Sequence, residues 1–385
     1  MKKGIIKIIA LIMTLACAVF SFTVGTNAEN TSYPNFELDC KSAILMEAST
    51  GKILYAKNEN EALPPASVTK VMTLLLVMEA IDDGKLKYTD MLSASEHACS
   101  MGGSQIFLEV GEQMSVEDLL KSVIIASAND AAVVLAEAVA GTESAFVETM
   151  NTRARELGME NTTFENTNGL DDTTENHLTS AKDIAIMSRE LIKYPKITEY
   201  SRIWMDTVRD GAFGLTNTNR LIRFYEGATG LKTGSTSKAG FCITATAERD
   251  GMTLIAVIMG SSGRDARNSA AVSLLNYGFS NFMLFKSQPE NYQISVEGGR
   301  SNACQAAEEE FVCVVNKKHA DKVEKNVELE DVLKAPVEKG SQIGTVTYKV
   351  NGETLGTAKI ITCEDVHSIR FSDILIRLLA RICMR

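Results

Sequence analysis

The sequence predicts a mixed α+β fold, in which an antiparallel sheet packs against a cluster of helices. Two strand-like runs meet at Gly51 within residues 43–60, and two more meet at Gly251 within residues 241–260. Between them, residues 113–157 carry apolar side chains at helical spacing. Strands at both ends of a helical middle favour an antiparallel sheet over regularly alternating strands and helices.

Further helices and one loop complete the predicted first domain. The helices run from about Ala66 to Ile81, over residues 181–194 and over residues 265–284. The segment 160–180 is rich in Asn, Thr and Asp. These residues favour turns over regular structure, so we expect a loop there.

A smaller all-β domain is predicted over residues 288–364, which leaves residues 29–287 for the first domain. Its strand-like runs are short and are separated by turn signals such as Asn351-Gly352. We expect these strands to form a small β-sandwich.

Residues 365–385 form the last predicted element, an amphipathic helix. The apolar stripe consists of Ile374, Leu375, Leu378, Leu379 and Ile382, and the arginines off it are Arg370, Arg377, Arg381 and Arg385. The segment is too charged to span a bilayer and suits a helix that lies on an anionic membrane surface. A helix packed on its own domain is the alternative.

Residues 1–28 are typical of a secretory signal peptide. A basic MKKGIIK segment precedes an apolar run, and small and polar residues follow up to Ala28. An uncleaved membrane anchor is one alternative, and a lipoprotein signal cut before Cys17 is another. We therefore expect the mature protein to be exported.

The composition indicates a globular protein that does not bind nucleic acid. Of the 385 residues, 45% are hydrophobic and 23% are charged, and the formal net charge is −10. A general nucleic-acid binder would normally carry a basic face. The apolar content is ample for a core and excludes a disordered chain.

The cysteine and histidine patterns predict neither full disulfide pairing nor a metal site. Removal of Cys17 with the signal leaves seven of the eight cysteines, an odd number. Cys304 and Cys313 are the pair that we would test first for a disulfide. Buried free thiols are the favoured interpretation of Cys40, Cys99 and Cys242. The four histidines are scattered, without an HExxH or CxxC motif, so no metal or cofactor is expected.

The strongest chemical signal is the pair Ser67 and Lys70 in 67-SVTK-70. Residues three apart on a helix stand on one face, about one turn apart. A serine hydroxyl needs a base to take its proton, and lysine becomes a base when burial or a nearby cation lowers its pKa. Lys232 is a candidate for that cation. The alternative is a surface turn, but the apolar run VMTLLLVM that follows predicts a buried helix.

Two further motifs follow in order, 127-SAN-129 and 232-KTG-234. The first is predicted to lie in a break between two helices, where it can point a hydroxyl and an amide into a cleft; an ordinary helix cap is the alternative. The second is predicted on a strand beside the cleft, where Gly234 lets a substrate backbone approach. A surface turn is the alternative for this motif.

In this order the three motifs resemble those of the penicillin-recognising serine enzymes. The chain looks most like the low-molecular-mass penicillin-binding proteins, which are serine-type D-alanyl-D-alanine carboxypeptidases. The similarity includes the stretches ALPPASVTKVMT, ASANDAA, NTNGLDD and GLKTGSTSKAGFC, the β domain and the terminal helix. It implies a penicillin-binding/β-lactamase-like fold, peptidoglycan stem peptides as substrate and β-lactams as covalent inhibitors. It also implies a place at the extracytoplasmic face of the cytoplasmic membrane or in the cell wall.

The resemblance also implies roles in catalysis. Ser67 attacks the carbonyl between the two terminal D-alanines and becomes acylated, and Lys70 takes its proton. Ser127, with Lys232 nearby, relays a proton to the leaving D-alanine.

The remaining implied roles concern substrate binding. Asn129 bonds the substrate amide, and Thr233 in the Lys-Thr-Gly motif, with Lys232, receives the terminal carboxylate. Backbone N–H groups of Ser67 and Ser235 form the oxyanion hole. Arg267 assists with the carboxylate, although a surface salt bridge explains that residue as well.

Other functions stay open at this point. A class A β-lactamase shares the motifs and deacylates with a Glu-x-x-x-Asn glutamate, but Glu165 is followed four places later by Gly169, and Asn168 is one place short. A D,D-endopeptidase uses the same machinery on cross-links. A non-catalytic peptidoglycan-binding protein predicts a broken motif, and all three motifs are intact.

Overall fold

A computed structural model of the protein describes residues 33–34 and 36–383. The predicted signal peptide, with Cys17, lies outside the described residues. From Phe36 onwards the chain forms a compact unit, and its first part is built on a five-stranded sheet of order β2-β1-β9-β8-β7. All neighbouring strands in it are antiparallel, as the sequence predicts. The strands are β1 (Ser42–Glu47), β2 (Ile53–Lys57), β7 (Ala228–Thr236), β8 (Gly240–Arg249) and β9 (Met252–Ser261).

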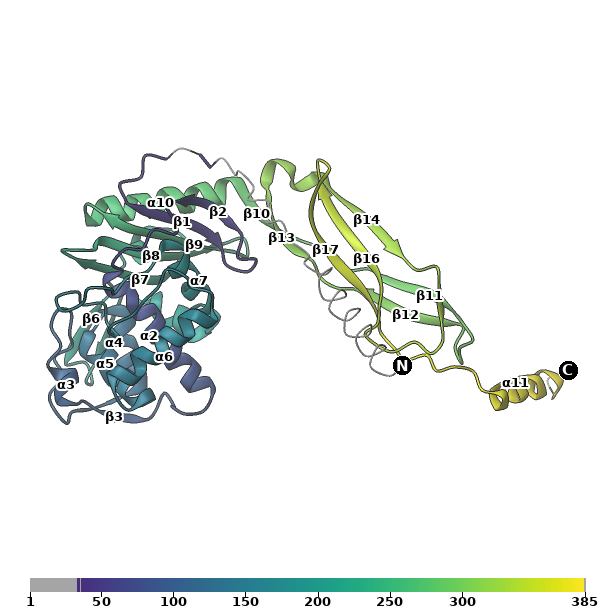
Figure 1. The fold of residues 1–385 in the computed structure, drawn as a ribbon, viewed down its shortest axis with the longest axis horizontal. Helices are drawn as coiled ribbons and strands as arrows, with labels where there is room; N and C mark the ends of the chain where they lie inside the picture. The colour runs from purple at the N-terminus through teal and green to yellow at the C-terminus, as the bar shows by residue number, and fades with distance from the viewer. Residues whose placement is uncertain (1–32, 35, 384–385) are drawn as a thin grey trace, which may run out of the picture. The chain divides into compact units, whose positions relative to one another are not determined.

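Helices cover both faces of this sheet (Figure 1). Helix α10 (Arg264–Asn281) packs on β8 and β9 on one face, and α7 (Ala181–Leu191) packs on β1 and β9 on the other. The helices α3 (Glu96–Cys99), α4 (Val116–Ile125), α5 (Asn129–Ala140) and α6 (Glu143–Glu156) gather beyond α7. Two short helices, α8 (Pro195–Ser201) and α9 (Leu221–Phe224), contact strand β7. Two small hairpins accompany them, β3 (Met91–Ser93) with β4 (Gln113–Ser115) and β5 (Met205–Val208) with β6 (Phe213–Thr216).

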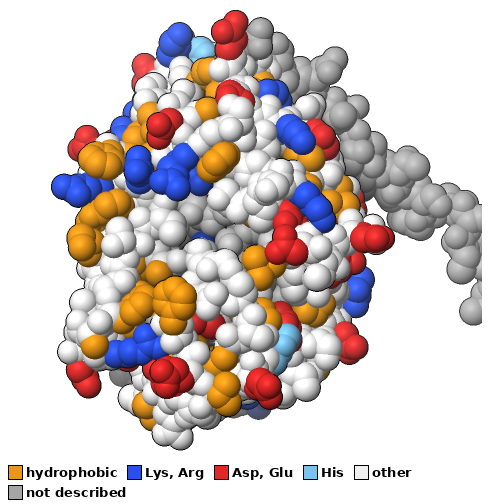
Figure 2. All heavy atoms as spheres, turned by 90° about the vertical axis from the view of Figure 1, so that its left-hand side faces the viewer, with side chains coloured by type: hydrophobic (Ala, Val, Ile, Leu, Met, Phe, Trp, Pro, Cys, Tyr) orange, Lys and Arg blue, Asp and Glu red, His pale blue; other side chains and the backbone are white. Residues whose placement is uncertain are grey.

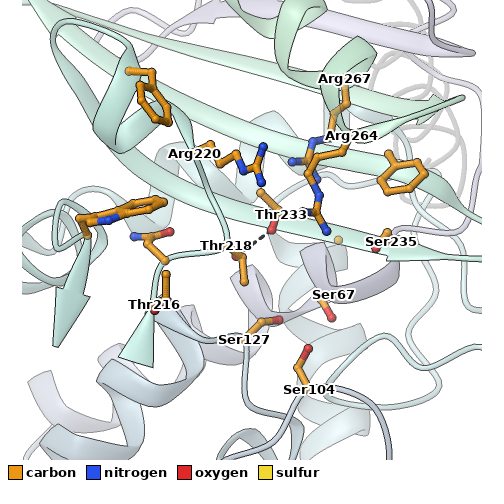
Figure 3. Close-up of a pocket in the computed structure, with 15 residues that line it drawn as sticks. Ser67, Ser104, Ser127, Thr216, Thr218, Arg220, Thr233, Ser235, Arg264 and Arg267 are labelled. Carbon is orange, nitrogen blue, oxygen red and sulfur yellow. Dashed lines mark hydrogen bonds between the residues drawn. The ribbon is translucent and has the colours of Figure 1, made fainter. Parts of the chain in front are cut away.

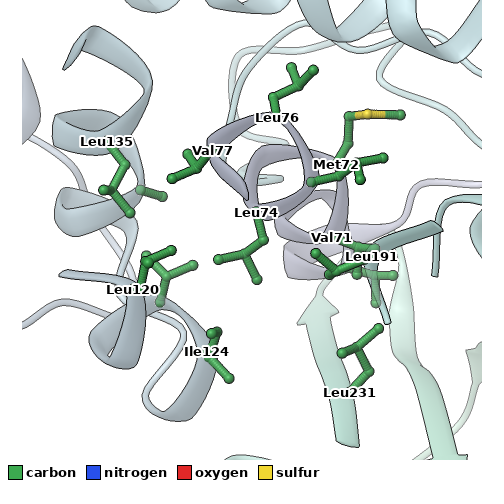
Figure 4. Close-up of a cluster of buried hydrophobic side chains, with 14 of the residues drawn as sticks. Val71, Met72, Leu74, Leu76, Val77, Leu120, Ile124, Leu135, Leu191 and Leu231 are labelled. Carbon is green, nitrogen blue, oxygen red and sulfur yellow. The ribbon is translucent and has the colours of Figure 1, made fainter. Parts of the chain in front are cut away.

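Helix α2 (Lys70–Asp82) lies at the centre of the helical cluster. Its apolar side chains point outward in several directions, toward Leu120 and Leu135 on one side and toward Leu191 and Leu231 on the other (Figure 4). A helix that is apolar all round is stable only when protein surrounds it. The sequence VMTLLLVM therefore places α2 in the interior, and the serine that precedes it lies at the end of this buried helix.

The end of the first domain differs from the prediction. The helix expected over residues 265–284 stops at Asn281, and β10 (Phe282–Lys286) follows it directly. This strand pairs antiparallel with β13 (Val312–Asn316), which belongs to the β-rich region. Phe282, Leu284 and Phe285 suit a strand as well as a helix, so local sequence alone did not separate the two.

The β-rich region contains one six-stranded sheet of order β14-β16-β17-β12-β11-β15, besides the short β10–β13 pair. The prediction of an all-β domain is confirmed, but the described strands do not form the two sheets of similar size that a β-sandwich has. Phe285 of β10 packs against the core of the larger sheet. The strands are β11 (Asn291–Glu297), β12 (Ala303–Glu308), β14 (Val323–Leu329), β15 (Val332–Lys334), β16 (Gln342–Val350) and β17 (Glu353–Thr362), and η2 (Lys317–Lys322) is a 3-10 turn.

Helix α11 (Phe371–Cys383) forms within the predicted terminal helix. Most of its described apolar side chains are exposed, from 42% for Ile374 to 80% for Phe371. Among the described residues, no helix is both long and apolar enough to span a membrane.

The cysteines whose side chains the structure describes are free thiols, and these are Cys40, Cys99, Cys242, Cys304, Cys313 and Cys363. The pairing considered for Cys304 and Cys313 is therefore not present. Cys304 lies buried on β12 and Cys313 half-buried on β13. Of the three thiols expected to be buried, Cys242 is fully buried, whereas Cys40 and Cys99 are partly exposed.

Candidate active site

Ser67 lies in a 3-10 turn, η1 (Ala66–Thr69), that continues into α2. Lys70 is the first residue of α2, and its Nζ lies 3.0 Å from Ser67 Oγ. The spacing of three residues thus places both groups on one face, as the sequence predicts. Ser67 is partly exposed, whereas Lys70 is completely buried.

The surroundings of Lys70 suit a neutral amine. Its Nζ donates to Asn129 Oδ1 at 2.5 Å and to the backbone oxygen of Asn168 at 2.8 Å. Neither oxygen can donate a hydrogen bond in return, so these two contacts take both N–H groups of an uncharged amine. The remaining lone pair then faces the Ser67 hydroxyl, which is the arrangement that a base needs.

Electrostatics favour the same uncharged state. Burial lowers the pKa of Lys70 well below its usual value, and the positive charge of Lys232 lowers it further. Asp130 acts in the opposite direction, but its carboxylate is already bonded to the backbone N–H groups of Ile106 and Leu108. The net effect is a pKa well below the usual value of lysine, which is the direction that a base requires.

Ser127 and Lys232 form the second polar pair of the site. Ser127 lies between α4 and α5 with a positive φ of 64°, a conformation that a non-glycine residue keeps only when its surroundings enforce it. Lys232 Nζ donates to Ser127 Oγ at 2.8 Å and to the backbone oxygen of Thr233 at 2.9 Å. Burial, followed by the charge of Arg267, lowers the pKa of Lys232 to about 7.

The Lys-Thr-Gly motif lies on β7, one of the two edge strands of the sheet. A Cβ atom on Gly234 would lie 2.7 Å from Ser67 N and 2.9 Å from Val68 N, so only glycine fits. The expectation that Gly234 makes room for a substrate backbone is thus incomplete, because the backbone nearest to it is that of the nucleophile turn. Ser235, one residue further, is exposed at the strand edge.

These residues surround a cleft of about 670 Å³. Figure 2 shows a hollow near the middle of this face of the molecule, and Figure 3 shows the side chains that line the cleft. The lining residues are Ser67, Ser104, Ser127, Trp204, Thr216, Asn217, Thr218, Arg220, Phe224, Thr233, Gly234, Ser235, Phe241, Arg264 and Arg267. A volume of this size is in the range of sites for small molecules and short peptides.

Comparison with known proteins agrees with this geometry. Residues 27–263 match the D-alanyl-D-alanine carboxypeptidase family, and residues 279–368 match the C-terminal domain of penicillin-binding protein 5. The chain belongs to the D-alanyl-D-alanine carboxypeptidase family. D-alanyl-D-alanine carboxypeptidase DacF of Bacillus subtilis is 42% identical over 369 residues, which cover 94% of this chain and 93% of that protein.

Solved structures of D-alanyl-D-alanine carboxypeptidases and other penicillin-binding proteins share the fold. Penicillin-binding protein 5 of Haemophilus influenzae has a TM-score of 0.77 at 32% identity, covering 88% of this chain and 100% of that one. Penicillin-binding protein D2 of Listeria monocytogenes, in its ampicillin-bound form, has a TM-score of 0.59 at 32% identity, covering 64% of this chain and 100% of that one. The predicted family and fold class are therefore confirmed.

Glu165 does not have the position that a β-lactamase base requires. Its carboxylate accepts hydrogen bonds from the backbone N–H groups of Glu175 and Asn176, and its side chain does not line the cleft around Ser67. The residue of this loop that reaches Lys70 is Asn168, through its backbone oxygen. The loop therefore orients Lys70 through a backbone oxygen and does not bring Glu165 to the nucleophile.

Two predicted binding residues have surroundings that the motifs did not reveal. Both polar ends of Asn129 are bonded within the protein, Oδ1 to Lys70 and Nδ2 to the backbone oxygen of Gly102 at 2.6 Å. Its proposed contact with a substrate amide stays a prediction. Arg267 lines the cleft and is only 3% exposed, so the surface salt bridge considered for it is wrong. Its guanidinium bonds Asn268 Oδ1 and the backbone oxygen of Cys242.

Several cleft residues were missed from the sequence. Arg264 has a detectable signal, because it precedes Arg267 by three residues on α10 and so shares its face. Thr218 has none in the sequence, yet its hydroxyl lies 2.8 Å from that of Thr233. Trp204, Arg220 and Phe224 come from a segment without a recognised motif, and only the tertiary fold brings them to the cleft.

Proposed function

We propose that this chain is a serine-type D-alanyl-D-alanine carboxypeptidase that removes the terminal D-alanine from peptidoglycan stem peptides. The observation that carries the proposal is the buried amine of Lys70, which is bonded to two carbonyl oxygens and lies 3.0 Å from Ser67 Oγ. Membership of the carboxypeptidase family supplies the reaction class. We also propose that β-lactams acylate Ser67, since a relative in the same fold binds ampicillin.

The geometry supports the following acylation step. Lys70 takes the proton of Ser67 as Oγ attacks the carbonyl carbon between the two D-alanines, and an ester forms. Backbone N–H groups of Ser67 and Ser235 stabilise the oxyanion. Ser127, bonded to Lys232, passes a proton to the departing amine. Water then hydrolyses the ester and regenerates the serine.

The terminal carboxylate has a positively charged receptor. Thr233 presents its hydroxyl to the cleft, and Arg264 and Arg267 lie on α10 beside it (Figure 3). Lys232 is 1% exposed and bonded to Ser127, so it contributes charge from behind the strand rather than direct contact. Such a site favours a peptide that ends in a free carboxylate.

The test of this proposal uses the purified protein and two probes. Release of D-alanine from diacetyl-L-Lys-D-Ala-D-Ala measures the reaction, and a fluorescent penicillin measures acylation. We expect the wild type to do both and Ser67→Ala to do neither. Absence of D-alanine release from the wild type, or labelling that survives in Ser67→Ala, would disprove the assignment. Rapid turnover of penicillin would instead favour a β-lactamase.

We further propose that the protein is exported and lies at the extracytoplasmic face of the cytoplasmic membrane, held there by α11. The sequence of residues 1–28 supports export. The apolar side chains of Leu375, Leu378 and Leu379 are about half exposed, and nothing in the described chain covers them. A helix with such a stripe binds at the bilayer interface.

A paired substitution tests the anchor without shortening the chain. Leu378 lies on the stripe and is 53% exposed, whereas Ile376 is 64% exposed and lies on the opposite side of the helix. We expect Leu378→Ser to reduce cosedimentation with anionic vesicles, and Ile376→Ser to leave it nearly unchanged. Equal binding of both variants and of a chain without residues 366–385 would rule out the anchor.

A further inference from the structure

The loop that orients Lys70 is attached to α2 at two neighbouring points. The backbone oxygen of Asn168 accepts the hydrogen bond from Lys70 Nζ at 2.8 Å. One residue earlier, the backbone oxygen of Thr167 accepts a hydrogen bond from Thr73 Oγ1 at 2.5 Å. Lys70 and Thr73 are three residues apart and share one face of α2. Because Thr167 and Asn168 are adjacent, a displacement of Thr167 also displaces the acceptor of Lys70.

A carboxylate from another helix holds the same segment of the loop. Glu143 Oε1 accepts a hydrogen bond from Thr167 N at 3.0 Å and another from Thr167 Oγ1 at 2.7 Å. Among the described residues, no other acceptor takes these two donors. Thr167 is completely buried, and a buried donor without an acceptor is unfavourable. Loss of the Glu143 carboxylate would therefore force Thr167 to move.

The position of Glu143 is itself fixed by the fold. Glu143 is the first residue of α6 and follows the cap residue Thr142, whose side chain accepts a hydrogen bond from Ala145 N. The N-terminus of a helix favours a negatively charged side chain. Glu143 Oε2 accepts a hydrogen bond from His97 Nε2 at 2.6 Å, and the side chain of Glu143 is only 15% exposed. One carboxylate oxygen is thus held by His97 while the other holds Thr167.

We propose that Glu143 is a positioning residue for the base of the acylation step. Through Thr167, its carboxylate keeps the backbone oxygen of Asn168 beside Lys70. The amine of Lys70 then stays oriented toward Ser67 Oγ. Glu143 does not line the cleft around the nucleophile, so it acts only through this series of contacts. This inference rests on the carboxypeptidase function proposed above.

The effect of Glu143 is transmitted by hydrogen bonds and not by its charge. The charges that shift the pKa of Lys70 are those of Lys232 and Asp130, and that of Glu143 is not among them. A neutral side chain that still accepts both hydrogen bonds of Thr167 should therefore replace the carboxylate. Glutamine has such an oxygen, whereas alanine has none.

The acylation kinetics of two substitutions test the proposal. With a fluorescent penicillin, the limiting acylation rate, the half-saturating concentration and the final labelled fraction are measured separately. We expect Glu143→Ala to lower the limiting rate at least about tenfold, because small displacements of a catalytic group are costly. Its half-saturating concentration and labelled fraction should stay unchanged, and Glu143→Gln should restore most of the lost rate. A merely structural role would lower the labelled fraction and leave the limiting rate of the folded protein unchanged.

Glu137→Ala provides the matched control. Glu137 and Glu143 line the same groove of about 460 Å³, but the hydrogen bonds and ion pairs of the described residues do not include the carboxylate of Glu137. Both alanine substitutions remove one negative charge from the groove, and only Glu143→Ala removes the acceptor of Thr167. The limiting rate of Glu137→Ala should therefore match that of the wild type.

Thr167→Val gives a second test that does not depend on the folding of Glu143→Ala. Valine removes the hydroxyl donor and keeps the N–H group, so we expect a smaller fall of the limiting rate. When both substitutions are combined, Glu143→Ala should lower the rate by a smaller factor than it does in the wild type, because part of the contact is already lost. Independent effects of the two substitutions on the limiting rate would overturn the inference.

Three further results would also overturn it. They are equal limiting rates in Glu143→Ala and Glu137→Ala, equal losses in Glu143→Ala and Glu143→Gln, and an unchanged limiting rate in Thr167→Val. Each of these results leaves the carboxypeptidase assignment intact. If the wild type neither binds penicillin nor releases D-alanine, the proposed function itself is wrong.

Discussion

Asn129 Oδ1 accepts a hydrogen bond of 2.5 Å from Lys70 Nζ. This contact fixes the orientation of the amine that faces Ser67, and it does so through an oxygen without formal charge. A carboxylate at the same place would stabilise the protonated lysine and remove the base. The amide of the Ser-x-Asn motif thus has an electrostatic role in this chain besides any contact with substrate.

Replacement of Asn129 by aspartate should therefore move the pH dependence of acylation. A negative charge beside Lys70 Nζ raises the pKa of Lys70, so the neutral, active form needs a higher pH. We expect the rate of penicillin acylation near pH 7 to fall at least about tenfold and to recover partly as the pH rises. The measurement is the acylation rate against pH, followed with a fluorescent penicillin.

Asn129→Ser is the neutral control for this experiment. It removes the amide oxygen without adding a charge, so we expect the rate to fall at every pH without a shift of the acidic limb of the pH profile. If the acidic limb of the pH profile is not shifted in Asn129→Asp, the base must be a group other than Lys70.

Gly169 should be irreplaceable in the loop that reaches Lys70. Its φ is +86°, and a Cβ atom there would lie 1.9 Å from the backbone oxygen of Ala66 and 2.8 Å from Thr69 Oγ1. Gly169→Ala must therefore displace the loop from the Ser67 turn, with loss of the Asn168 contact to Lys70. We expect a lower melting temperature and loss of most penicillin acylation.

Gly141→Ala is the control that separates the cost of backbone strain from the effect of the steric clash at Gly169. Gly141 has a similar φ of +82° but no atom within 4 Å of a Cβ position. Its replacement should cost only about 1–2 kcal/mol, the strain of a left-handed non-glycine residue. Equal effects of the two substitutions on acylation would contradict the proposed loop contact.

The three motifs could be recognised in the sequence because their chemistry depends on short spacing. Ser67 and Lys70 share a face through helix geometry alone, and the apolar run after them indicates that the face is buried. Lys232 acts on the same site, but its contact with Ser127 joins residues 105 positions apart. Only the resemblance to known enzymes, not spacing, indicated that pairing.

What could not be predicted depends on tertiary packing. The near approach of Gly234 to the Ser67 backbone arises where strand β7 crosses η1, and no local pattern contains that crossing. The part of the cleft wall between α8 and β7 is similar, because Asn217 and Thr218 are held by partners on other elements. The strand β10 was missed for a local reason, because its apolar run fits both a helix end and a strand.

His177 should make the free energy of unfolding depend on pH in the acidic range. Its Nδ1 accepts from the backbone N–H of Glu165 at 2.9 Å, and its Nε2 lies 2.7 Å from Thr69 Oγ1. Burial lowers the pKa of His177 from 6.5 to about 4. The unfolded chain takes up the proton first as the pH falls, so stability is full above about pH 6.5 and decreases down to about pH 4. The shift corresponds to about 3 kcal/mol of unfolding free energy.

His177→Gln tests this linkage because glutamine keeps polar atoms at the site and does not titrate. The free energy of unfolding of both proteins is measured by urea denaturation between these two pH values. The wild type should be more stable at neutral pH, and its advantage should shrink by about 3 kcal/mol at the acidic end. A constant difference would mean that His177 does not titrate as its burial requires.

Arg264 and Arg267 should contribute differently to recognition of the terminal carboxylate. The guanidinium of Arg267 is held by Asn268 Oδ1 and by Cys242 O. Burial lowers the pKa of Lys232 to about 7, and the charge of Arg267 contributes to this shift. Arg264 is exposed to the cleft, and the ion pairs and hydrogen bonds of the described residues do not include its side chain. We therefore expect Arg264 to bind the carboxylate directly and Arg267 to act on Lys232.

Paired substrates and pH profiles distinguish these two roles. Amidation of the terminal carboxylate should lower kcat/KM of the wild type at least about tenfold, as expected for loss of a charged hydrogen bond. Arg264→Gln should abolish most of this preference without moving the pH profile. Arg267→Gln removes a neighbouring positive charge, so the pKa of Lys232 rises and the limb that follows its titration moves from about 7 to higher pH. A shifted limb in Arg264→Gln and an unshifted one in Arg267→Gln would reverse the assignment, because the charge that acts on Lys232 would then come from Arg264.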